Sequence, residues 1–207
     1  MDKKKVLVIV AHPDDETIWM GGSLIQNREK WETSILCMCR KSDEDRYPKF
    51  LKSCEILGAK PFIFDLDDTT LDSISLNEYI KIIQQFSETD YDYIFTHGKN
   101  GEYGHIRHKE IHKVVKDMFD KQTLKARRIF FFSYVKEKDD FQGHCICDSS
   151  ANIFIKLNDD ELLLKKSLIK DVYGYQIGGF EEESAAGVEA FLELKNENLS
   201  SLPSSFG

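Results

Sequence analysis

The sequence has neither a long hydrophobic run nor a clustered basic segment. The apolar stretch at residues 6–10 is far shorter than the roughly 20 residues that a membrane-spanning helix needs, and shorter than the core of a secretory signal. Lys and Arg total 28 against 36 Asp and Glu, which gives a net charge of -8. A general nucleic-acid binder needs a basic face that neutralises phosphates, so this composition argues against one. We expect a soluble, cytoplasmic protein without a membrane span.

Disulfide and nucleotide-binding patterns are also missing. Five cysteines form an odd set in a chain without a secretory signal, which favours reduced thiols. The glycines at 98, 101 and 104 fit neither the dinucleotide fingerprint nor the P-loop. Cys37 with Cys39, and Cys145 with Cys147, could form a second metal site with His144, but such pairs are more often small buried side chains.

Apolar, β-branched runs alternate along the chain with segments of helical periodicity. Strands are expected at residues 6–11, 33–39, 61–64, 93–96, 128–135 and 152–156, and helices at 17–29, 47–57, 76–87, 105–119 and 159–172. The helix over 47–57 should end at Gly58. This order predicts an α/β fold, a three-layer, Rossmann-like, mostly parallel sheet with helices on both faces. We expect one domain over residues 1–207, with an irregular tail from about 174.

Two polar clusters directly follow predicted strands, at residues 12–16 and 97–108. In an open parallel sheet, ligands bind beyond the carboxyl ends of the strands. His12, Asp15 and His108 supply two imidazoles and a carboxylate, which with one open position is the ligand set of a catalytic zinc. We therefore expect one Zn²⁺ per chain at these residues.

The local sequence around each cluster favours this convergence. Pro13 fixes its own backbone angle, so the chain can turn sharply and send His12 and Asp15 toward one point. Asp14 lies between them and is a candidate to accept the proton of an attacking water. Each motif alone is weak evidence, because acidic residues are common at helix starts. The prediction rests on their joint position after two strands of one sheet.

The second cluster leads into a helix that begins near His105. His108 lies three residues further on, on the same helix face. His112 falls on this face too, beside apolar residues, and we interpret it as a packing or supporting residue rather than a ligand.

These motifs resemble those of the PIG-L or LmbE-like zinc deacetylases, which remove acetyl groups from N-acetylglucosamine derivatives and related amides. Residues 8–16, followed by Gly21 and Gly22, resemble the amino-terminal motif of the family, and residues 96–108 resemble the second. The resemblance extends to the helix end at 57–58 and faintly to 175–176. It implies a small-molecule amide substrate, first of all an N-acetylated sugar, and leaves a homo-oligomer open.

The resemblance also implies roles for single residues. It assigns the zinc ligands to His12, Asp15 and His108. Asp14 would be the general base, and His105, as an imidazolium, would protonate the departing amine or stabilise the oxyanion. Arg46, at the position of a family arginine, would bind the oxyanion or a substrate oxygen, with a solvated surface arginine as the alternative.

The second motif departs from the family pattern at one position. The family usually has His-Pro-Asp-His, whereas this chain has Arg107 in place of the aspartate. A carboxylate that orients a catalytic histidine is therefore absent or supplied from elsewhere.

Two other functions compete with deacetylation. Residues 64–72 resemble the nucleophile motif of haloacid-dehalogenase-like, Mg²⁺-dependent phosphatases, with Asp65 as nucleophile and Asp67 as acid and base. That motif normally opens its domain, and no downstream acidic pair completes it, so we interpret residues 65–72 as a polar loop near the pocket rim. The other alternative is a non-catalytic metal-binding relative.

The pocket walls are expected from loops at 65–72, 136–143 and 173–187. Tyr173, Tyr175 and Phe180 lie in the last of these and either stack on a sugar or belong to the core.

Overall fold

The computed structural model describes residues 2–70, 72–137 and 143–195. The strands are β1 (Lys4–Val10), β2 (Trp31–Cys39), β3 (Ala59–Leu66), β4 (Tyr91–Thr96), β5 (Ala126–Phe132), β6 (Tyr134–Lys136), β7 (Cys145–Cys147), β8 (Ile153–Lys156) and β9 (Val188–Lys195). The helices are α1 (Asp15–Asn27), α2 (Arg46–Leu57), α3 (Leu76–Ile83), α4 (Ile106–Asp120), α5 (Asp159–Ser167) and α6 (Phe180–Ser184). A 3₁₀ turn, Gln84–Phe86, follows α3, and a π-helical turn, Leu168–Val172, follows α5.

The main sheet has the strand order β3-β2-β1-β4-β5-β9-β8. Its first five strands are parallel, while β9 runs antiparallel to both β5 and β8. The chain returns to the sheet centre between β3 and β4, so β1 lies between β2 and β4. Such a reversal of strand order opens a crevice at the carboxyl ends of the adjacent strands, which is where the site described below lies.

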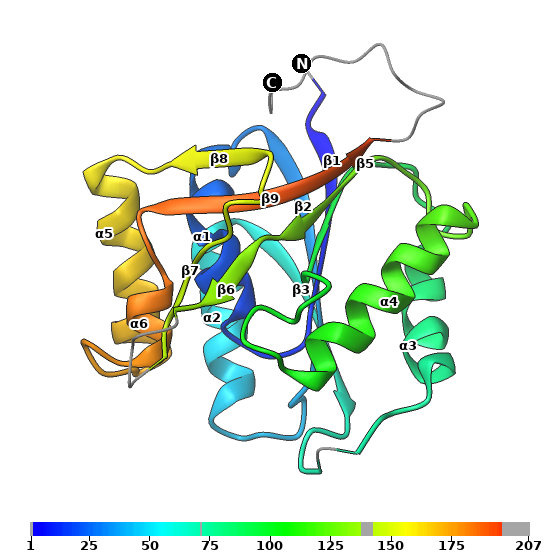
Figure 1. Cartoon of the computed structure of the whole chain (residues 1–207), viewed down its shortest axis with the longest axis horizontal. Helices are drawn as coiled ribbons and strands as arrows, with labels where there is room; N and C mark the ends of the chain where they lie inside the picture. Colours follow the sequence, from blue (N-terminus) through cyan, green and yellow to red (C-terminus); the bar gives the residue numbers. More distant parts are fainter. Residues whose placement is uncertain (1, 71, 138–142, 196–207) are drawn as a thin grey trace.

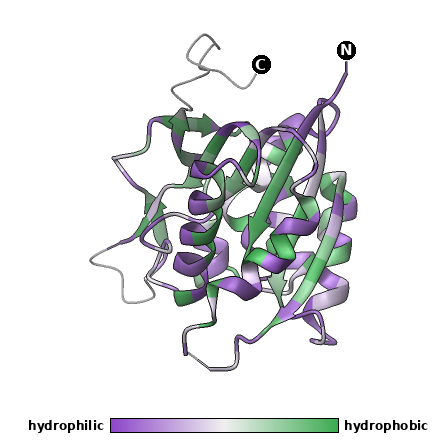
Figure 2. Ribbon diagram, turned by 90° about the vertical axis from the view of Figure 1, so that its right-hand side faces the viewer, coloured by the Kyte–Doolittle hydropathy of each residue, from purple (hydrophilic) through white to green (hydrophobic). Residues whose placement is uncertain are grey.

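Helices cover both faces of the sheet, so the predicted three-layer α/β fold is confirmed. In Figure 1, α3 and α4 lie on the right of the sheet, and α1, α2, α5 and α6 lie on the left. Alternate residues of β1 enter the two cores: Val8 packs on the side of α1 and α2, and Leu7 and Ile9 pack on the side of α3 and α4. Figure 2 shows the resulting pattern, with mainly hydrophobic strands behind helices that alternate between hydrophobic and hydrophilic residues.

Most predicted element positions agree with the structure within a few residues. The predicted helix end at Gly58 is confirmed: this glycine adopts a left-handed conformation with φ 69°, and its amide donates to carbonyls of the last turn. The predicted strand at 128–135 is two strands, because the chain leaves the main sheet at Ser133 and β6 pairs with β7 in a separate two-stranded sheet.

Within residues 175–195, the prediction of an irregular tail is wrong. This segment contains α6 and β9, and β9 lies inside the main sheet. Two buried glutamates interrupt its hydrophobic pattern, Glu189 and Glu193, and each has a buried cationic partner. Because Lys165 and Arg128 satisfy these carboxylates, a strand with acidic residues is accommodated in the interior.

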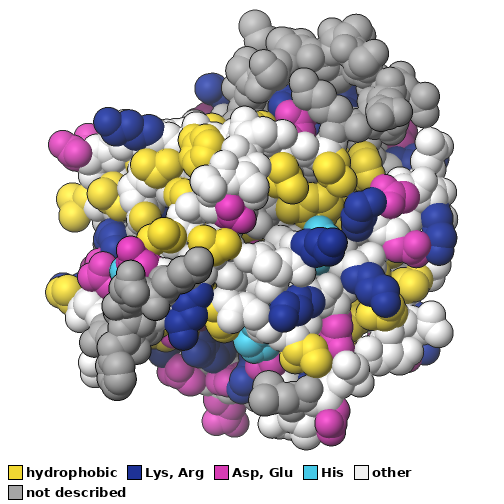
Figure 3. Space-filling view, in the orientation of Figure 1, with side chains coloured by type: hydrophobic (Ala, Val, Ile, Leu, Met, Phe, Trp, Pro, Cys, Tyr) yellow, Lys and Arg dark blue, Asp and Glu magenta, His cyan; other side chains and the backbone are white. Residues whose placement is uncertain are grey.

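One surface of the molecule combines exposed apolar and basic side chains. Figure 3 shows hydrophobic side chains over β8 and β9 and Lys and Arg side chains over α4. Phe154 and Leu192 are 52% and 37% exposed on these strands. None of the helices in the described residues combines the length and apolar character that a membrane crossing requires.

Candidate metal and catalytic site

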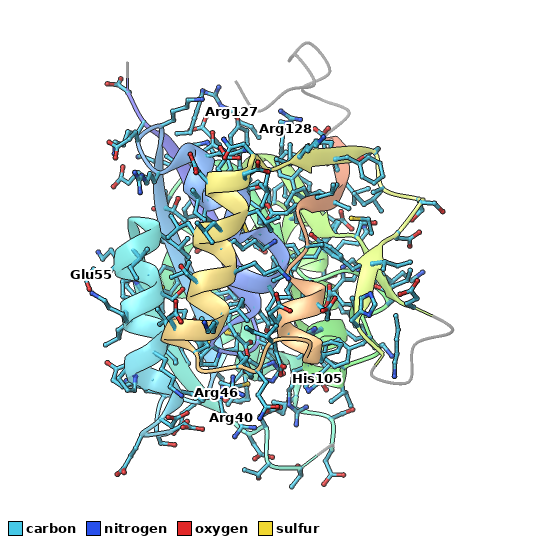
Figure 4. The ribbon with its side chains drawn as sticks, turned by 90° about the vertical axis from the view of Figure 1, so that its left-hand side faces the viewer. Arg40, Arg46, Glu55, His105, Arg127 and Arg128 are labelled. Carbon is cyan, nitrogen blue, oxygen red and sulfur yellow. The ribbon has the colours of Figure 1, made fainter. Side chains whose placement is uncertain are left out.

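A polar cavity of about 210 Å³ lies at the carboxyl ends of the parallel strands. Its walls include five residues that the sequence analysis singled out, His12, Asp14, Asp15, Arg46 and His105. In Figure 4, Arg40, Arg46 and His105 lie together at one end of the molecule, and Arg127 and Arg128 lie at the opposite end. The structure therefore brings the polar clusters after β1 and β4 to one place.

Three donor atoms from these clusters form a nearly equilateral triangle. His12 Nδ1 lies 3.3 Å from Asp15 Oδ2 and 3.3 Å from His108 Nε2, and the last two atoms are 3.4 Å apart. A tetrahedral zinc ion with ligands at about 2.0–2.1 Å separates neighbouring ligand atoms by roughly 3.3–3.4 Å. The donor set and its spacing thus fit a zinc ion.

Buried hydrogen bonds fix the orientation of His108 and Asp15. His108 Nδ1 lies 2.5 Å from Glu102 Oε2, which leaves Nε2 directed at the triangle. Asp15 Oδ1 accepts from Trp19 Nε1, and Asp15 Oδ2 accepts from the His12 amide. Burial opposes protonation of His108, but Asp15 and Glu102 outweigh it and raise the pKa of His108 to about 10. The electrostatics of the site therefore favour a positive charge at this position, which a bound cation would supply.

His97 lies close to the triangle but is not available as a ligand. Its ring stacks on His108 with the ring centroids 3.8 Å apart, and its Nε2 is 3.5 Å from Asp15 Oδ2. That Nε2 accepts the backbone amide of Ala11 at 3.0 Å, and Nδ1 faces Glu102 at 3.1 Å. Both ring nitrogens are therefore used by the protein, and His97 supports the site from behind.

Asp14 occupies a strained backbone conformation at the start of α1. Its φ of 121° and ψ of -30° are rarely adopted by residues other than glycine and cost about 1–3 kcal/mol. Glu16 holds this conformation by accepting the Asp14 amide at 3.1 Å. Burial and then the neighbouring Asp15 raise the pKa of Asp14 to about 7, against the opposing charge of Arg46.

Arg46 lies on this carboxylate instead of extending into solvent. Its Nη1 donates to Asp14 Oδ2 at 2.7 Å and to the Pro13 carbonyl at 3.1 Å. Tyr175 also donates to Asp14 Oδ2, and the guanidinium carbon lies 5.1 Å from the Tyr175 ring centroid. Arg46 is therefore paired with Asp14 and not free in solvent, and its contact with a substrate oxygen stays a prediction.

His105 caps the amino terminus of α4, and this fixes its tautomer. Its Nδ1 accepts the backbone amide of Arg107 at 3.2 Å, so the proton of a neutral ring lies on Nε2. Burial, together with His108 and His12, lowers the pKa of His105 to about 4. Both observations favour a neutral ring with Nε2 as its donor over the expected imidazolium.

The structure does not bring the phosphatase-like aspartates into a site. Asp65 accepts from Ser42 Oγ at 3.0 Å, and Asp67 accepts from the hydroxyls of Thr69 and Thr70. Neither carboxylate belongs to a cluster of possible metal ligands in the described part of the chain. The phosphatase interpretation gains no support from this geometry.

The remaining candidates have mixed outcomes. His112 Nδ1 donates to the His97 carbonyl oxygen at 2.9 Å, and the ring packs on Phe131, which agrees with a supporting role. Tyr173 is buried in the core, whereas Tyr175 and Phe180 line the cavity.

In the described residues, the second metal site considered at Cys145, Cys147 and His144 is not a group of possible metal ligands. The wall expected at 136–143 includes residues 138–142, which lie outside the described residues.

The sequence analysis missed three carboxylates that shape the site: Glu16, Glu102 and Asp68. Glu16 and Glu102 lie within the motifs at residues 8–16 and 96–108, so the sequence could have indicated both as site residues. Glu16 accepts hydrogen bonds from Thr17, Ser53 and Tyr173. Asp68 lines the cavity from the loop at 65–72, which the sequence analysis expected at the pocket rim without assigning this residue a role.

The fold and site together define an α/β protein with a cluster of histidines and carboxylates that could hold a metal ion at the carboxyl ends of its parallel strands. Within this class, the chain belongs to the PIG-L family: residues 7–119 match the family model described as GlcNAc-PI de-N-acetylase. This membership supports a deacetylase.

A curated relative is an uncharacterised protein of Acanthamoeba polyphaga mimivirus, 28% identical over 134 residues. The alignment covers 56% of this chain and 58% of the relative, so the match spans little more than half the length of that protein.

Three solved structures share the fold. N,N'-diacetylchitobiose deacetylase from Pyrococcus horikoshii has a TM-score of 0.71 at 17% identity, covering 99% of this chain and 88% of that one. A conserved protein from Thermus thermophilus has a TM-score of 0.70 at 16% identity, with 99% and 100% covered. A 4-carboxy-2-hydroxymuconate hydratase from Pseudomonas putida has a TM-score of 0.63 at 15% identity, with 99% and 98% covered. Because a hydratase shares the fold, the reaction has to be argued from the site.

Proposed function

We propose that this protein is a zinc-dependent N-deacetylase that removes the acetyl group from an N-acetylglucosamine-type sugar or glycoconjugate. The observation that carries the proposal is the triangle of His12 Nδ1, Asp15 Oδ2 and His108 Nε2, with Asp14 and His105 on the wall of the same cavity. A zinc ion held by this triangle would polarise the amide carbonyl and make the attacking water more acidic. Family membership supports the choice of amide hydrolysis.

The protein's own groups then divide the proton transfers. Asp14 accepts the proton of the attacking water and passes it to the departing amine, so a single carboxylate acts as base and then as acid. Arg46 and Tyr175 hold this carboxylate in place. His105 donates a hydrogen bond from Nε2 to the developing oxyanion, which needs only the neutral tautomer that the Arg107 amide selects.

The test is an assay of amine release from a panel of N-acetylated sugars and glycoconjugates, with a phosphate ester as a control substrate. We expect amine release by the zinc-loaded protein and no phosphate release. Asp14→Asn should reduce kcat by about 10²–10⁴-fold and leave the zinc content unchanged, because the side chain transfers protons but is not a ligand.

Asp45→Asn is the matched control, since Asp45 is an exposed aspartate that pairs with Lys49. It should retain the rate of the unmodified protein. Full activity in Asp14→Asn would overturn the base assignment. Zinc binding without turnover of any amide would favour a non-catalytic metal-binding relative.

A further inference from the structure

The two histidines of the proposed zinc triangle each have a second ring nitrogen that faces away from it. For His108 this nitrogen is Nδ1, and it meets Glu102 at 2.5 Å. For His12 it is Nε2, which is buried and makes no hydrogen bond of standard geometry with the described residues. Asp68 Oδ1, however, lies 3.2 Å from this atom. An imidazole ligand almost always has such a partner behind it, because the partner selects the tautomer and the ring orientation.

We propose that Asp68 is a positioning residue for the metal site, whose carboxylate holds His12 with Nε2–H toward the loop and Nδ1 toward the triangle. The inference rests on the proposed function, because it assigns a role at the same centre. It gives each histidine ligand one carboxylate of its own, Asp68 behind His12 and Glu102 behind His108.

Arg107 brings the loop that carries Asp68 to this position. Its guanidinium donates from Nε to the Asp67 carbonyl at 2.8 Å and from Nη2 to the Thr70 carbonyl at 3.1 Å. Its Nη1 donates to Glu110 on the same helix at 2.9 Å. The arginine is fully buried, and its two loop contacts flank Asp68 on either side. Arg107, which stands in place of the aspartate of the family motif, thus holds the loop so that the carboxylate of Asp68 lies beside the histidines.

Arg40 fixes the Asp68 side chain from the outside. Its Nε and Nη2 both donate to Asp68 Oδ2, at 3.1 and 2.7 Å, so Oδ1 is left for the histidines. Oδ1 is also 4.0 Å from His105 Nε2, the donor proposed for the oxyanion. The carboxylate therefore lies between a ligand histidine and a catalytic histidine.

A second cation is the competing explanation, because His12, Asp68 and Cys39 are near enough to hold one. The guanidinium of Arg40 already bonds to Asp68, and a positive charge at this distance opposes a further cation. The same arginine leaves the hydrogen-bonding role of Asp68 intact, so the geometry favours positioning.

The primary test measures zinc affinity by competition with a chelator, without any substrate. Asp68→Asn should weaken zinc binding about 10–100-fold, because an outer carboxylate contributes on this scale. Asp72→Asn removes the same charge from an exposed position of the same loop and should bind zinc within about twofold of the unmodified protein. Equal affinities of the Asp68 and Asp72 variants would overturn the proposal, as would a stoichiometry of two zinc ions per chain.

A spectroscopic measurement separates positioning from a general loss of structure. In long-range ¹H–¹⁵N spectra of the zinc-loaded protein, His12 should show a metal-bound Nδ1 and a protonated Nε2. Asp68→Asn should change the His12 signals and leave those of His108 unchanged, because Glu102 still holds His108. Identical His12 signals in both proteins, or equal changes in both histidines, would contradict the assignment.

The route through Arg107 is tested with a double variant. Arg107→Gln should also weaken zinc binding, and Arg107→Gln combined with Asp68→Asn should bind zinc no more weakly than Asp68→Asn alone. If the double variant lost zinc affinity by the product of the two single losses, Arg107 and Asp68 would act independently and this route would be overturned. Failure of the deacetylase proposal has a separate signature, namely a zinc-loaded protein that releases no amine while the affinity differences remain.

Discussion

At the scale of single residues, Glu102 is a carboxylate shared by two buried histidines. Its Oε2 lies 3.1 Å from His97 Nδ1 and 2.5 Å from His108 Nδ1. Both rings therefore present an N–H to the same oxygen, and both leave Nε2 as the acceptor or ligand atom. Its other oxygen accepts the Gly98 amide at 2.7 Å.

Replacing Glu102 with Gln should impair metal binding, although the two side chains have nearly the same size. The amide has one carbonyl oxygen and no charge, so it cannot serve His97, His108 and Gly98 equally. We expect zinc affinity to fall about 10–100-fold and the free energy of unfolding to fall by about 1–3 kcal/mol. Chelator competition and denaturant titration measure these changes.

The control is Glu55→Gln on the exposed face of α2, where the carboxylate pairs with Lys52. This variant should match the unmodified protein in both measurements. A Glu102→Gln protein with full zinc affinity would show that His108 does not need the carboxylate.

At the residue scale, the sequence predicted that the two polar clusters would converge, while the ligand roles stay a prediction. His12 and Asp15 share one turn, and His108 follows a strand that neighbours β1, so the positions of these residues could be predicted. The role of Asp68 could not be predicted, although its loop was expected at the pocket, because its contact with His12 depends on Arg40 and on the loop held by Arg107.

At the scale of elements, α1 depends on the absence of a side chain at one position. The helix is kinked at Met20, whose φ of -148° is not helical, and Gly21 and Gly22 follow. A Cβ atom on Gly22 would lie 2.2 Å from Leu157 Cδ2, whereas one on Gly21 would find its nearest neighbour at 3.4 Å. The two glycines are adjacent in sequence but differ in the space around them.

Gly22→Ala should therefore destabilise the protein by about 1–3 kcal/mol, because Leu157 has to move in a packed interior. In Gly21→Ala the new methyl group would have no neighbour closer than 3.4 Å. The free energy of unfolding should change by less than about 1 kcal/mol, because the better helix propensity of Ala offsets the slight crowding. Thermal or denaturant unfolding of the pair measures the difference. Equal stabilities would show that Leu157 repacks freely.

Element prediction was accurate for segments with a continuous hydrophobic pattern and failed where polar partners replace it. The strands of the parallel part were predicted because short runs of apolar, β-branched and aromatic residues mark them. The strand β9 was not, because Glu189 and Glu193 break its apolar alternation and their partners lie far away in the sequence.

At the scale of the whole molecule, the buried pair of Lys165 and Glu189 joins three elements. Lys165 Nζ on α5 lies 2.7 Å from Glu189 Oε1 on β9, and both side chains are fully buried. The same carboxylate accepts the amides of Gly22 and Ser23 on α1 at 2.7 and 2.8 Å. The helices α1 and α5 and the strand β9 therefore meet at one buried charged contact.

Lys165→Met should destabilise the protein by about 3–5 kcal/mol, because it leaves the Glu189 charge buried without its cation. Lys121→Met removes an exposed lysine that pairs with Asp117, and it should change stability by at most about 1 kcal/mol. Denaturant unfolding of the two variants provides the comparison. A small effect at Lys165 would indicate that the Gly22 and Ser23 amides suffice for the carboxylate.

The overall architecture could be predicted from the alternation of strands and helices, including helices on both faces. The antiparallel extension by β9 and β8 could not, because a short-range pattern does not reveal which edge a later strand joins. The position of β9 beside β5 is a tertiary result, supported by the buried pair of Arg128 and Glu193.

The position of β9 inside the sheet also sets an order for folding during synthesis. The strand pairs with β5 on one side and β8 on the other, although both precede it in the chain. At about 5–20 residues per second, the roughly 60 residues that separate the end of β5 from the end of β9 take about 3–12 s to make. Until then the edge of β5 has no strand beside it, and an emerging chain would expose that edge to chaperones or to neighbouring nascent chains.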